Sequence, residues 1–314
     1  MSRRLPIGVI GAARSAQAIA DHDAPLPGAQ VVRWAPSPCG QDRARAAALA
    51  ERTGAQFSAD WEAVAVDPAL PALLILSSDP GRRAAVDVAL SAGKVVLSPL
   101  PIVGTQAEVD RLAAAEARGR GVLLVPGTLR YTPAGSTTLR IVGDGELGTL
   151  HSLYAAGRFP WDDRAQGGPG VLEEAGWEIF DFLLAAAPAP VTRVHAETGA
   201  LFSPGVIDAA TLIIRFEDDV VATIDLARCL PPSIPTTPRG EIEIELIGSR
   251  QAVRLEPFAT SLTLFGPRAI HRPWVDDPVV AMVRHVVQVA GGEADRGDGV
   301  AHLRRAMALM DAVR

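Results

Sequence analysis

The sequence predicts two domains of different fold class. Residues 1–124 are expected to form an α/β domain with a doubly wound parallel sheet, and residues 125–314 an α+β domain with a mostly antiparallel open sheet. In the first third, short apolar runs alternate with helical stretches of about 10–15 residues, a pattern typical of parallel sheets. Farther along, runs of strand length follow one another without helices between them. A chain of 314 residues, 48% of them hydrophobic, is long enough to bury two cores.

Four helical segments separate the apolar runs of the first domain. The second is expected to stop at Gly54 and the third at Gly93, because glycine tolerates the left-handed conformation that ends many helices. Thr105, followed by Glu108 three residues later, is a capping-box pattern that opens the fourth. The expected strands are 5–12, 29–35, 71–78, 95–101 and 122–127, and the expected helices are 14–24, 41–55, 81–94 and 105–121.

The second domain is expected to open with a strand over 149–159 and an amphipathic helix over 167–187. Two hairpins follow, one turning at residues 217–219 and one near Gly248. Two helices are expected at the C-terminal end, over 277–292 and 299–314. One helix covers one face of the antiparallel sheet and the other face needs a partner, so a homodimer or homotetramer joined through these sheets is expected.

Charge and composition exclude several classes of partner. The net charge of -6 argues against a nucleic acid or an anionic membrane as partner. Cys39 and Cys229 are the only cysteines, too few for a disulfide framework or a cysteine-rich metal site. No stretch approaches the roughly 18 unbroken apolar residues that a membrane helix needs. The sequence therefore predicts a cytoplasmic protein that acts on a small molecule.

The turn after the first strand is where a dinucleotide binds in a doubly wound, Rossmann-like domain. It reads Gly11-Ala12-Ala13-Arg14-Ser15-Ala16, against the fingerprint G-x-G-x-x-G. The first glycine is present, and alanine is accepted in the third place. Ala13 stands where a bare backbone lets the pyrophosphate approach, so this contact is weakened. The turn predicts NAD or NADP as cofactor, with no cofactor as the alternative.

The choice between NAD and NADP stays open. The second strand ends at Ala35 and Pro36, without the carboxylate that binds the ribose hydroxyls of NAD. One alternative is that basic and hydroxyl side chains meet the 2′-phosphate of NADP; the other is that the arginines lie on a solvated surface. The residues in question are Arg14, Arg33, Ser37 and Arg43.

Five segments stand in a recognisable order along the chain. They read "GKVVLSPLPI", "PGTLRYTP", "GGPGVLEEAGWEIFD", "IEIELIGSRQAV" and "DPVVAMVRHVVQVAGG", the last followed by "GVAHLRRAMALMDA". In order and spacing, nearly end to end, they resemble the family named for glucose–fructose oxidoreductase, inositol 2-dehydrogenase and a rhizopine-catabolism protein (Gfo/Idh/MocA). The resemblance implies a Rossmann-like domain followed by an α+β domain. It also implies NAD(P)-dependent oxidation or reduction of a sugar, cyclitol or related small polyol.

The resemblance also shows where the usual catalytic residues of that family are replaced. In its E-K-P motif a lysine takes part in proton transfer, and the matching triplet here has Leu100 in the lysine's place. Its D-x-G-x-H motif supplies a carboxylate and a histidine that exchanges a proton with the substrate, and here Glu174 keeps the carboxylate while Glu178 replaces the histidine. Lys94, the only lysine of the chain, matches a different family lysine and is expected at the surface.

The resemblance divides the candidate site into three groups. The acid/base candidates are Glu174 and Glu178, and the substrate-binding candidates are Arg130, Trp161 and Asp181. No metal ligand set is assigned. The cofactor-binding candidates are Gly11, Ala12, Ala13, Arg14, Ser15, Ser77, Ser78 and Pro99.

The carboxylates have a physical reading of their own. Glu174 and Glu178 are four residues apart on a predicted helix and share a face, with Asp181 on the same side. A glutamate with its ordinary pKa of about 4.3 is a poor base near neutrality unless burial or a neighbouring carboxylate raises that pKa. Such a cluster suits acid/base work, a cationic ligand or a divalent metal. The structural alternative is that Glu178 pairs with Arg130 or Arg158.

Three functions therefore remain open. The first is an oxidoreductase with a degenerate catalytic site. The second is a pseudoenzyme without dehydrogenase activity, which binds a small metabolite or a partner. The third is a non-redox lyase or epimerase that uses the carboxylates.

Overall fold

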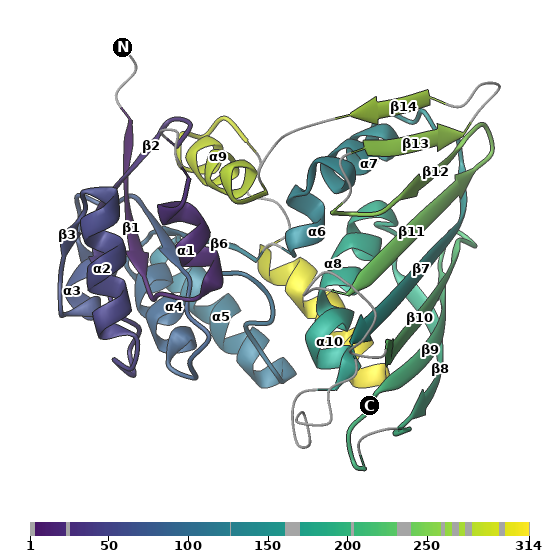
Figure 1. Cartoon of the computed structure of the whole chain (residues 1–314), viewed down its shortest axis with the longest axis horizontal. Helices are drawn as coiled ribbons and strands as arrows, with labels where there is room; N and C mark the ends of the chain where they lie inside the picture. The colour runs from purple at the N-terminus through teal and green to yellow at the C-terminus, as the bar shows by residue number, and fades with distance from the viewer. Residues whose placement is uncertain are drawn as a thin grey trace. The chain divides into compact units, whose positions relative to one another are not determined.

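The computed structural model describes residues 4–22, 26–125, 127–160, 170–201, 204–230, 240–258, 261–265, 270–273, 278–294 and 299–313. The chain divides into two compact units (Figure 1). The first unit comprises residues 1–126 and 277–307, and the second comprises 127–276 and 308–314.

The first unit is built on a six-stranded parallel sheet with the strand order β3-β2-β1-β4-β5-β6, which confirms the predicted doubly wound fold. β4 and β5 are buried along their whole lengths, as expected for strands covered on both faces. The strands are β1 (Leu5–Ile10), β2 (Ala29–Ala35), β3 (Gln56–Phe57), β4 (Ala72–Ile75), β5 (Val95–Leu97) and β6 (Val122–Leu124). The helices between them are α1 (Arg14–Ala20), α2 (Arg43–Thr53), α3 (Trp61–Val66), α4 (Arg82–Ser91) and α5 (Gln106–Gly119).

The local signals at the helix ends act as predicted. Gly54 ends α2 with a φ of 69°, and Gly93 follows α4 with a φ of 77°. Thr105 caps α5 by accepting a hydrogen bond from the backbone N–H of Glu108, whose carboxylate accepts one from Gly104. Two short elements, β3 and α3, were not predicted; β3 has two residues and α3 has six, too few for a clear periodicity. Asp60 caps α3 through two backbone N–H groups.

The prediction for Lys94 was wrong. Its side chain is buried rather than exposed, and its Nζ donates a hydrogen bond of 2.5 Å to the carbonyl oxygen of Asp67. Burial lowers the pKa of Lys94, and the charge of Asp67 opposes this shift. The aliphatic stem of lysine can follow an apolar surface while its amine finds a polar partner, and this explains the burial at the start of β5.

The C-terminal helices divide differently from the predicted domain boundary. α9 (Pro278–Ala290) contacts α1, β2, β4 and β5, and therefore belongs to the first unit instead of the second. Its buried side chains Met282, Val283, Val286 and Val289 form the apolar stripe that makes this contact. α10 (Gly299–Val313) also begins in the first unit, where Arg304 pairs with Asp110 of α5. A continuous sequence range does not describe either unit.

The second unit contains an eight-stranded sheet in the order β14-β13-β12-β11-β7-β10-β9-β8. Only the β7–β10 pair is parallel among the described pairs, so the sheet is mostly antiparallel as predicted. Both predicted hairpins, β9–β10 and β11–β12, are confirmed. The strands are β7 (Leu150–Pro160), β8 (Val191–Gly199), β9 (Ala209–Phe216), β10 (Val221–Leu230), β11 (Glu241–Gly248), β12 (Ala252–Leu255), β13 (Ser261–Phe265) and β14 (Ile270–Pro273).

Helices of the second unit lie on one face of this sheet (Figure 1). The predicted helix after β7 is present as a π-helical turn, Leu172–Gly176, that continues as α8 (Trp177–Ala186). Two helices that the pattern did not predict, α6 (Thr128–Tyr131) and α7 (Pro133–Gly143), precede β7 and contact α8. None of the helices in the described ranges has the length and apolarity needed to cross a bilayer.

Candidate functional site

The cofactor candidates of the first unit lie along one edge of the parallel sheet. Gly11 follows β1, Ser77 follows β4 and Pro99 follows β5, and these three strands are neighbours. Gly11 has a φ of 100°, and a Cβ at this position would stand 2.6 Å from the carbonyl oxygen of Leu76. The turn after β1 is therefore tight, and it requires glycine for both conformation and space. This edge is the place where doubly wound sheets bind their ligands.

The second glycine position of the fingerprint is filled by an alanine without strain. Ala13 has φ −67° and ψ 177°, an extended conformation that any residue adopts. Its N–H donates to the carbonyl oxygen of Leu76 at 3.0 Å. The indole Nε1 of Trp34 donates to the carbonyl oxygen of Gly11 at 2.9 Å and fixes the turn against β2. The turn thus has a regular, hydrogen-bonded backbone, although it carries alanine where the fingerprint has glycine.

A carboxylate that the sequence analysis did not single out lies at the same edge. Asp42 accepts hydrogen bonds from the N–H of Ala12 at 2.8 Å and from the N–H and hydroxyl of Ser37, each at 2.8 Å. It therefore joins the turn after β1 to the segment after β2. The conventional place for an acidic residue is the end of β2, whereas Asp42 lies seven positions beyond Ala35.

The four residues that could meet a 2′-phosphate have different surroundings in the structure. The side chain of Arg33 lies 3.8 Å from the carboxylate of Asp67. Ser37 is buried and its hydroxyl is bound to Asp42. Arg14 and Arg43 are exposed, as the solvated-surface alternative expects.

An arginine lies beside the triplet that matches the E-K-P motif. Arg82 donates a hydrogen bond of 3.2 Å to the carbonyl oxygen of Pro99 and another to that of Pro101. The two carbonyls flank Leu100, so the guanidinium holds the backbone of this segment. Burial lowers the pKa of Arg82 to about 10, against the opposing charge of Asp79. Ser78 is exposed in the same edge region, and Ser77 is buried.

In the second unit, the acid/base candidates lie together on the wall of a pocket of about 330 Å³. Glu174 and Glu178 both contribute, as their spacing predicted. None of the described residues that line this pocket has a basic side chain. The lining residues are Thr128, Leu129, Phe159, Pro160, Glu174, Ala175, Glu178, Ile242 and Phe258.

Glu178 has the environment of a group that exchanges protons near neutral pH. Burial, with a smaller contribution from the charge of Asp181, raises its pKa from 4.5 to about 7. Its carboxylate accepts a hydrogen bond of 3.2 Å from the N–H of Leu129, and hydrogen bonds from Thr128 also oppose the rise. The structural alternative was wrong on this point, because Arg130 pairs with Asp181 and Arg158 pairs with Asp225.

Glu174 differs from Glu178 in its partner. It forms an ion pair with Arg228 of β10, whose side chain is nearly buried. The Glu174 side chain itself is half exposed. The two glutamates of the pocket are therefore chemically distinct: one is compensated by a cation, and the other is held by neutral donors.

Of the three substrate candidates, the structure describes two: Asp181 is buried and Arg130 is partly exposed. Asp181 is fully buried, accepts a hydrogen bond of 3.1 Å from the N–H of Gly127, and lies 3.3 Å from Arg130. Neither Asp181 nor Arg130 is among the residues that line the pocket. A Cβ on Gly127 would stand 2.5 Å from the Asp181 carboxylate, so the α8 side chain packs directly on this backbone. Trp161 lies outside the described residues.

Several residues of the pocket were missed by the sequence analysis. Phe159, at the end of β7, and Phe258, after β12, come from segments far apart in the sequence. Their strand-end positions were the only available signal. Within the described part of the chain, no group of three or more His, Cys, Asp or Glu residues is arranged to hold a metal ion.

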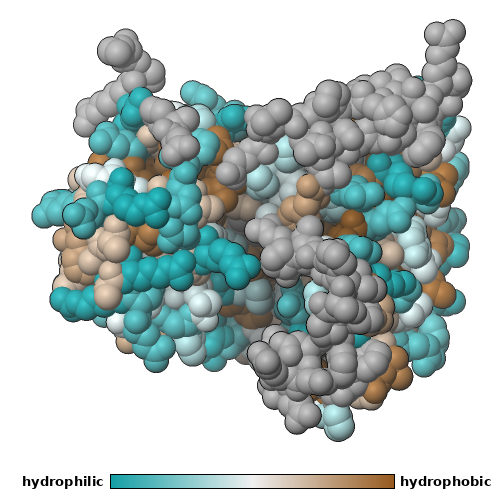
Figure 2. Space-filling view, in the orientation of Figure 1, coloured by the Kyte–Doolittle hydropathy of each residue, from teal (hydrophilic) through white to brown (hydrophobic). Residues whose placement is uncertain are grey.

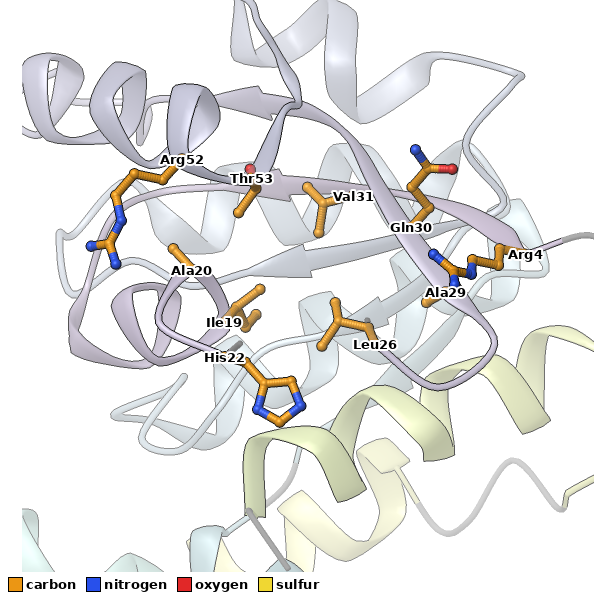
Figure 3. A pocket seen from close by; sticks show the side chains of 10 residues that line it. All are labelled: Arg4, Ile19, Ala20, His22, Leu26, Ala29, Gln30, Val31, Arg52 and Thr53. Atoms are coloured by element: carbon orange, nitrogen blue, oxygen red, sulfur yellow. The ribbon is translucent and has the colours of Figure 1, made fainter. Parts of the chain in front are cut away.

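A second pocket, of about 320 Å³, lies in the first unit at the opposite ends of the strands. Figure 3 shows its two arginines, Arg4 and Arg52, on opposite sides, so their guanidinium groups do not converge. Arg52 is already paired with Asp21 at 2.6 Å. The pocket is lined by Arg4, Ile19, Ala20, His22, Leu26, Ala29, Gln30, Val31, Arg52 and Thr53. It brings together no set of groups suited to catalysis.

Comparison with known proteins identifies relatives of this chain. Residues 137–254 match the model of the GFO/IDH/MocA C-terminal domain. An uncharacterized oxidoreductase of Bacillus subtilis, YrbE, is 28% identical over 181 residues, or 55% of this chain and 53% of that protein. Inositol 2-dehydrogenase 2 of Saccharopolyspora erythraea is 26% identical over 232 residues, or 71% of this chain and 66% of that protein. The matched regions span between about half and two thirds of these curated relatives.

The fold is shared with solved structures along the whole chain. A putative NADPH-dependent oxidoreductase from Desulfitobacterium hafniense superposes with a TM-score of 0.83 at 15% identity, covering 100% of this chain and 95% of its own. At this identity the likeness concerns the fold alone.

Proposed function

The chain belongs to the Gfo/Idh/MocA family, and from this premise we propose that it is a nicotinamide-dependent oxidoreductase of a small polyhydroxy compound, such as a sugar or cyclitol. The observation that carries the proposal is Glu178, a carboxyl group on a pocket wall with a pKa of about 7. A group of this pKa is suited to take or give a proton near neutral pH. In this role Glu178 replaces the histidine expected from the family pattern.

The first unit supplies the residues that would hold the cofactor. The tight turn at Gly11, with Ser77 and Pro99 on the neighbouring strand ends, offers a backbone surface at the carboxyl edge of the sheet. When bound, a nicotinamide dinucleotide accepts or donates a hydride. Arg82 holds the carbonyls on either side of Leu100 and so fixes the shape of this edge. Leu100 itself has no ionisable group, which leaves proton exchange to another residue.

The proton is handled by Glu178 in this proposal. In the direction of oxidation, the ionised carboxylate takes the proton of the substrate hydroxyl; in the direction of reduction, the protonated form returns it. The donors at Thr128 and Leu129 orient the carboxylate and stabilise its charged form. Asp181 opposes ionisation from its buried position. The balance of these effects holds the pKa near neutrality.

The lining of the pocket favours an uncharged substrate. Two glutamates face the space, and the described lining offers no basic side chain for a phosphate or carboxylate of the substrate. Phe159 and Phe258 provide apolar surface on which the less polar face of a sugar ring can pack. We therefore expect neutral polyols to bind better than sugar acids or sugar phosphates.

Calorimetric titration with NAD, NADH, NADP and NADPH tests the proposal. At least one of the four is expected to bind with a Kd below about 1 mM, which corresponds to about 4 kcal/mol of binding free energy. Hydride transfer from a panel of neutral sugars and cyclitols to that cofactor is then expected, followed by nicotinamide absorbance. Weaker binding of all four would reject the oxidoreductase. It would leave the metabolite-binding pseudoenzyme or the non-redox lyase or epimerase, in which Glu178 works without a cofactor.

The oligomer expected from the sequence remains a proposal. On the sheet face opposite α7 and α8, large hydrophobic side chains are partly exposed, including Tyr154 and Ile213, which flank Thr223 in the register. The eight-stranded sheet lies at the right of Figure 2, and hydrophobic residues are interspersed there among hydrophilic ones. We propose that this face joins two or four copies of the chain.

Introducing positively charged side chains on this sheet face should prevent the copies of the chain from associating. The double substitution Tyr154→Arg and Ile213→Arg is expected to convert a dimer or tetramer to a monomer in light scattering. Leu201→Arg is the control, because Leu201 is an exposed hydrophobic residue in a loop after β8. A monomeric unsubstituted protein at micromolar concentration, or an unchanged mass in the double variant, contradicts the proposed interface.

A further inference from the structure

The side chain of Asp42 makes unusual contacts for an N-cap residue. It immediately precedes α2, where aspartate normally accepts a hydrogen bond from its own helix. Here it makes no such side-chain bond. Its carboxylate is instead directed to Ala12, after β1, and to Ser37, after β2. The Asp42 side chain therefore does not cap α2, and instead connects two segments at the carboxyl edge of the sheet.

The hydrogen bonds of Asp42 are shared unequally between its two oxygens. Oδ1 accepts both from the N–H and from the hydroxyl of Ser37. Oδ2 accepts from the N–H of Ala12 at 2.8 Å, its one described donor. A carboxylate has about four acceptor positions in all. Oδ2 therefore keeps capacity for a further donor beside the turn at Gly11.

We propose that Asp42 selects NAD(H) over NADP(H) by binding the ribose diol of the adenosine half and repelling a 2′-phosphate. This inference rests on the proposed function, because it concerns the cofactor of that reaction. A ribose hydroxyl is a neutral donor and suits the open position on Oδ2. A 2′-phosphate has no comparable donor and would bring a second negative charge against the carboxylate.

A second carboxylate reinforces the negative character of this edge. Asp79, two residues after Ser77, lies in contact with the polar groups of Ser37, Ser77 and Cys39. Burial raises its pKa, but these groups outweigh burial and the pKa is lowered overall, so Asp79 is ionised at neutral pH. Of the basic side chains that could meet a 2′-phosphate, Arg33 is engaged with Asp67, and Arg14 and Arg43 are exposed to solvent. The described groups around Ser37 thus favour a diol.

Calorimetry with NAD and NADP, on the full chain, tests the selection. The unsubstituted protein is expected to bind NAD about 100-fold more tightly than NADP, the size expected for one added like-charge contact at the protein surface. Asp42→Asn should reduce this ratio to about tenfold or less, by weakening NAD and strengthening NADP. The control is Glu51→Gln, which removes a negative charge from the exposed surface of α2 and should leave the ratio unchanged.

The outcomes separate this inference from the proposed function. Equal or tighter binding of NADP by the unsubstituted protein overturns the selection by Asp42 while leaving the oxidoreductase intact. Binding of neither dinucleotide overturns both. An unchanged ratio in an Asp42→Asn variant with the circular dichroism spectrum of the parent also overturns it. The ratio in the unsubstituted protein does not depend on whether any variant folds.

Discussion

Replacing Glu178 with glutamine is expected to lower kcat/KM for the polyol substrate by about 10²–10⁴-fold, the usual contribution of a positioned acid/base group. Glutamine has nearly the same shape and can still accept the hydrogen bond from Leu129, but it cannot take a proton. The affinity for the dinucleotide should be unchanged. The measurement is steady-state kinetics with a calorimetric Kd, and the control is Glu197→Gln, at a well-exposed side chain of β8.

The same substitution should change stability in a pH-dependent way. Burial raises the pKa of Glu178 from 4.5 to about 7 in the folded protein, so the folded state binds this proton more tightly than the unfolded state does. Below pH 4.5 both states are protonated and the group costs nothing. As pH rises from 4.5 to 7, stability falls by about 3 kcal/mol, and above pH 7 the loss stays constant.

Glu178→Gln removes this loss, because glutamine does not ionise. Urea unfolding at pH 4.5 and pH 8 should show a gain for the variant at pH 8 that is absent at pH 4.5. Lower activity together with higher stability at pH 8 is the signature expected of a carboxyl group kept buried for function. An unchanged kcat/KM in the folded variant removes Glu178 from the reaction, whatever the stability shows.

Much of the first unit could be predicted from the sequence because its strands are buried on both faces. Such strands appear as unbroken apolar runs, and glycines or capping residues mark the ends of the helices between them. The same reasoning failed for Lys94, since sequence pattern does not show that a carbonyl lies within reach of a long side chain. It also assigned α9 to the wrong unit, because an apolar helical stripe does not identify its partner.

The candidate site was predicted unevenly for a similar reason. The spacing of Glu174 and Glu178 placed both on one pocket, because residues four apart share a helix face. The partners that make them different, Arg228 and Leu129, come from other elements. Asp42 was missed because its role depends on the approach of two loops rather than on a motif. Local pattern therefore locates Glu174 and Glu178, while their protonation and charge balance depend on tertiary contacts.

Removing the Asp181 carboxylate is expected to destabilise the second unit and to lower the pKa of Glu178. Asp181→Ala leaves Arg130 and the N–H of Gly127 without this acceptor. Breaking a buried pair costs about 3–5 kcal/mol, and the partial exposure of Arg130 reduces the expected loss to about 2–4 kcal/mol. Asp181→Asn should cost less, because its amide oxygen can still accept from Gly127.

Both variants also remove a negative charge that raises the pKa of Glu178, so the acidic limb of the kcat/KM profile should shift to lower pH. Urea unfolding and the pH profile measure the two effects separately.

Asp144→Ala is the matched control, since its pair with Arg140 is exposed and worth less than about 1 kcal/mol. A cost for Asp181→Ala no larger than that of the control would show that the buried pair contributes little. An unshifted pH profile in Asp181→Asn would mean that the charge of Asp181 does not contribute to the pKa of Glu178. With the shift, Asp181 acts on Glu178 through its charge: it lies outside the pocket, yet it adds to the rise in the pKa of Glu178 that burial produces.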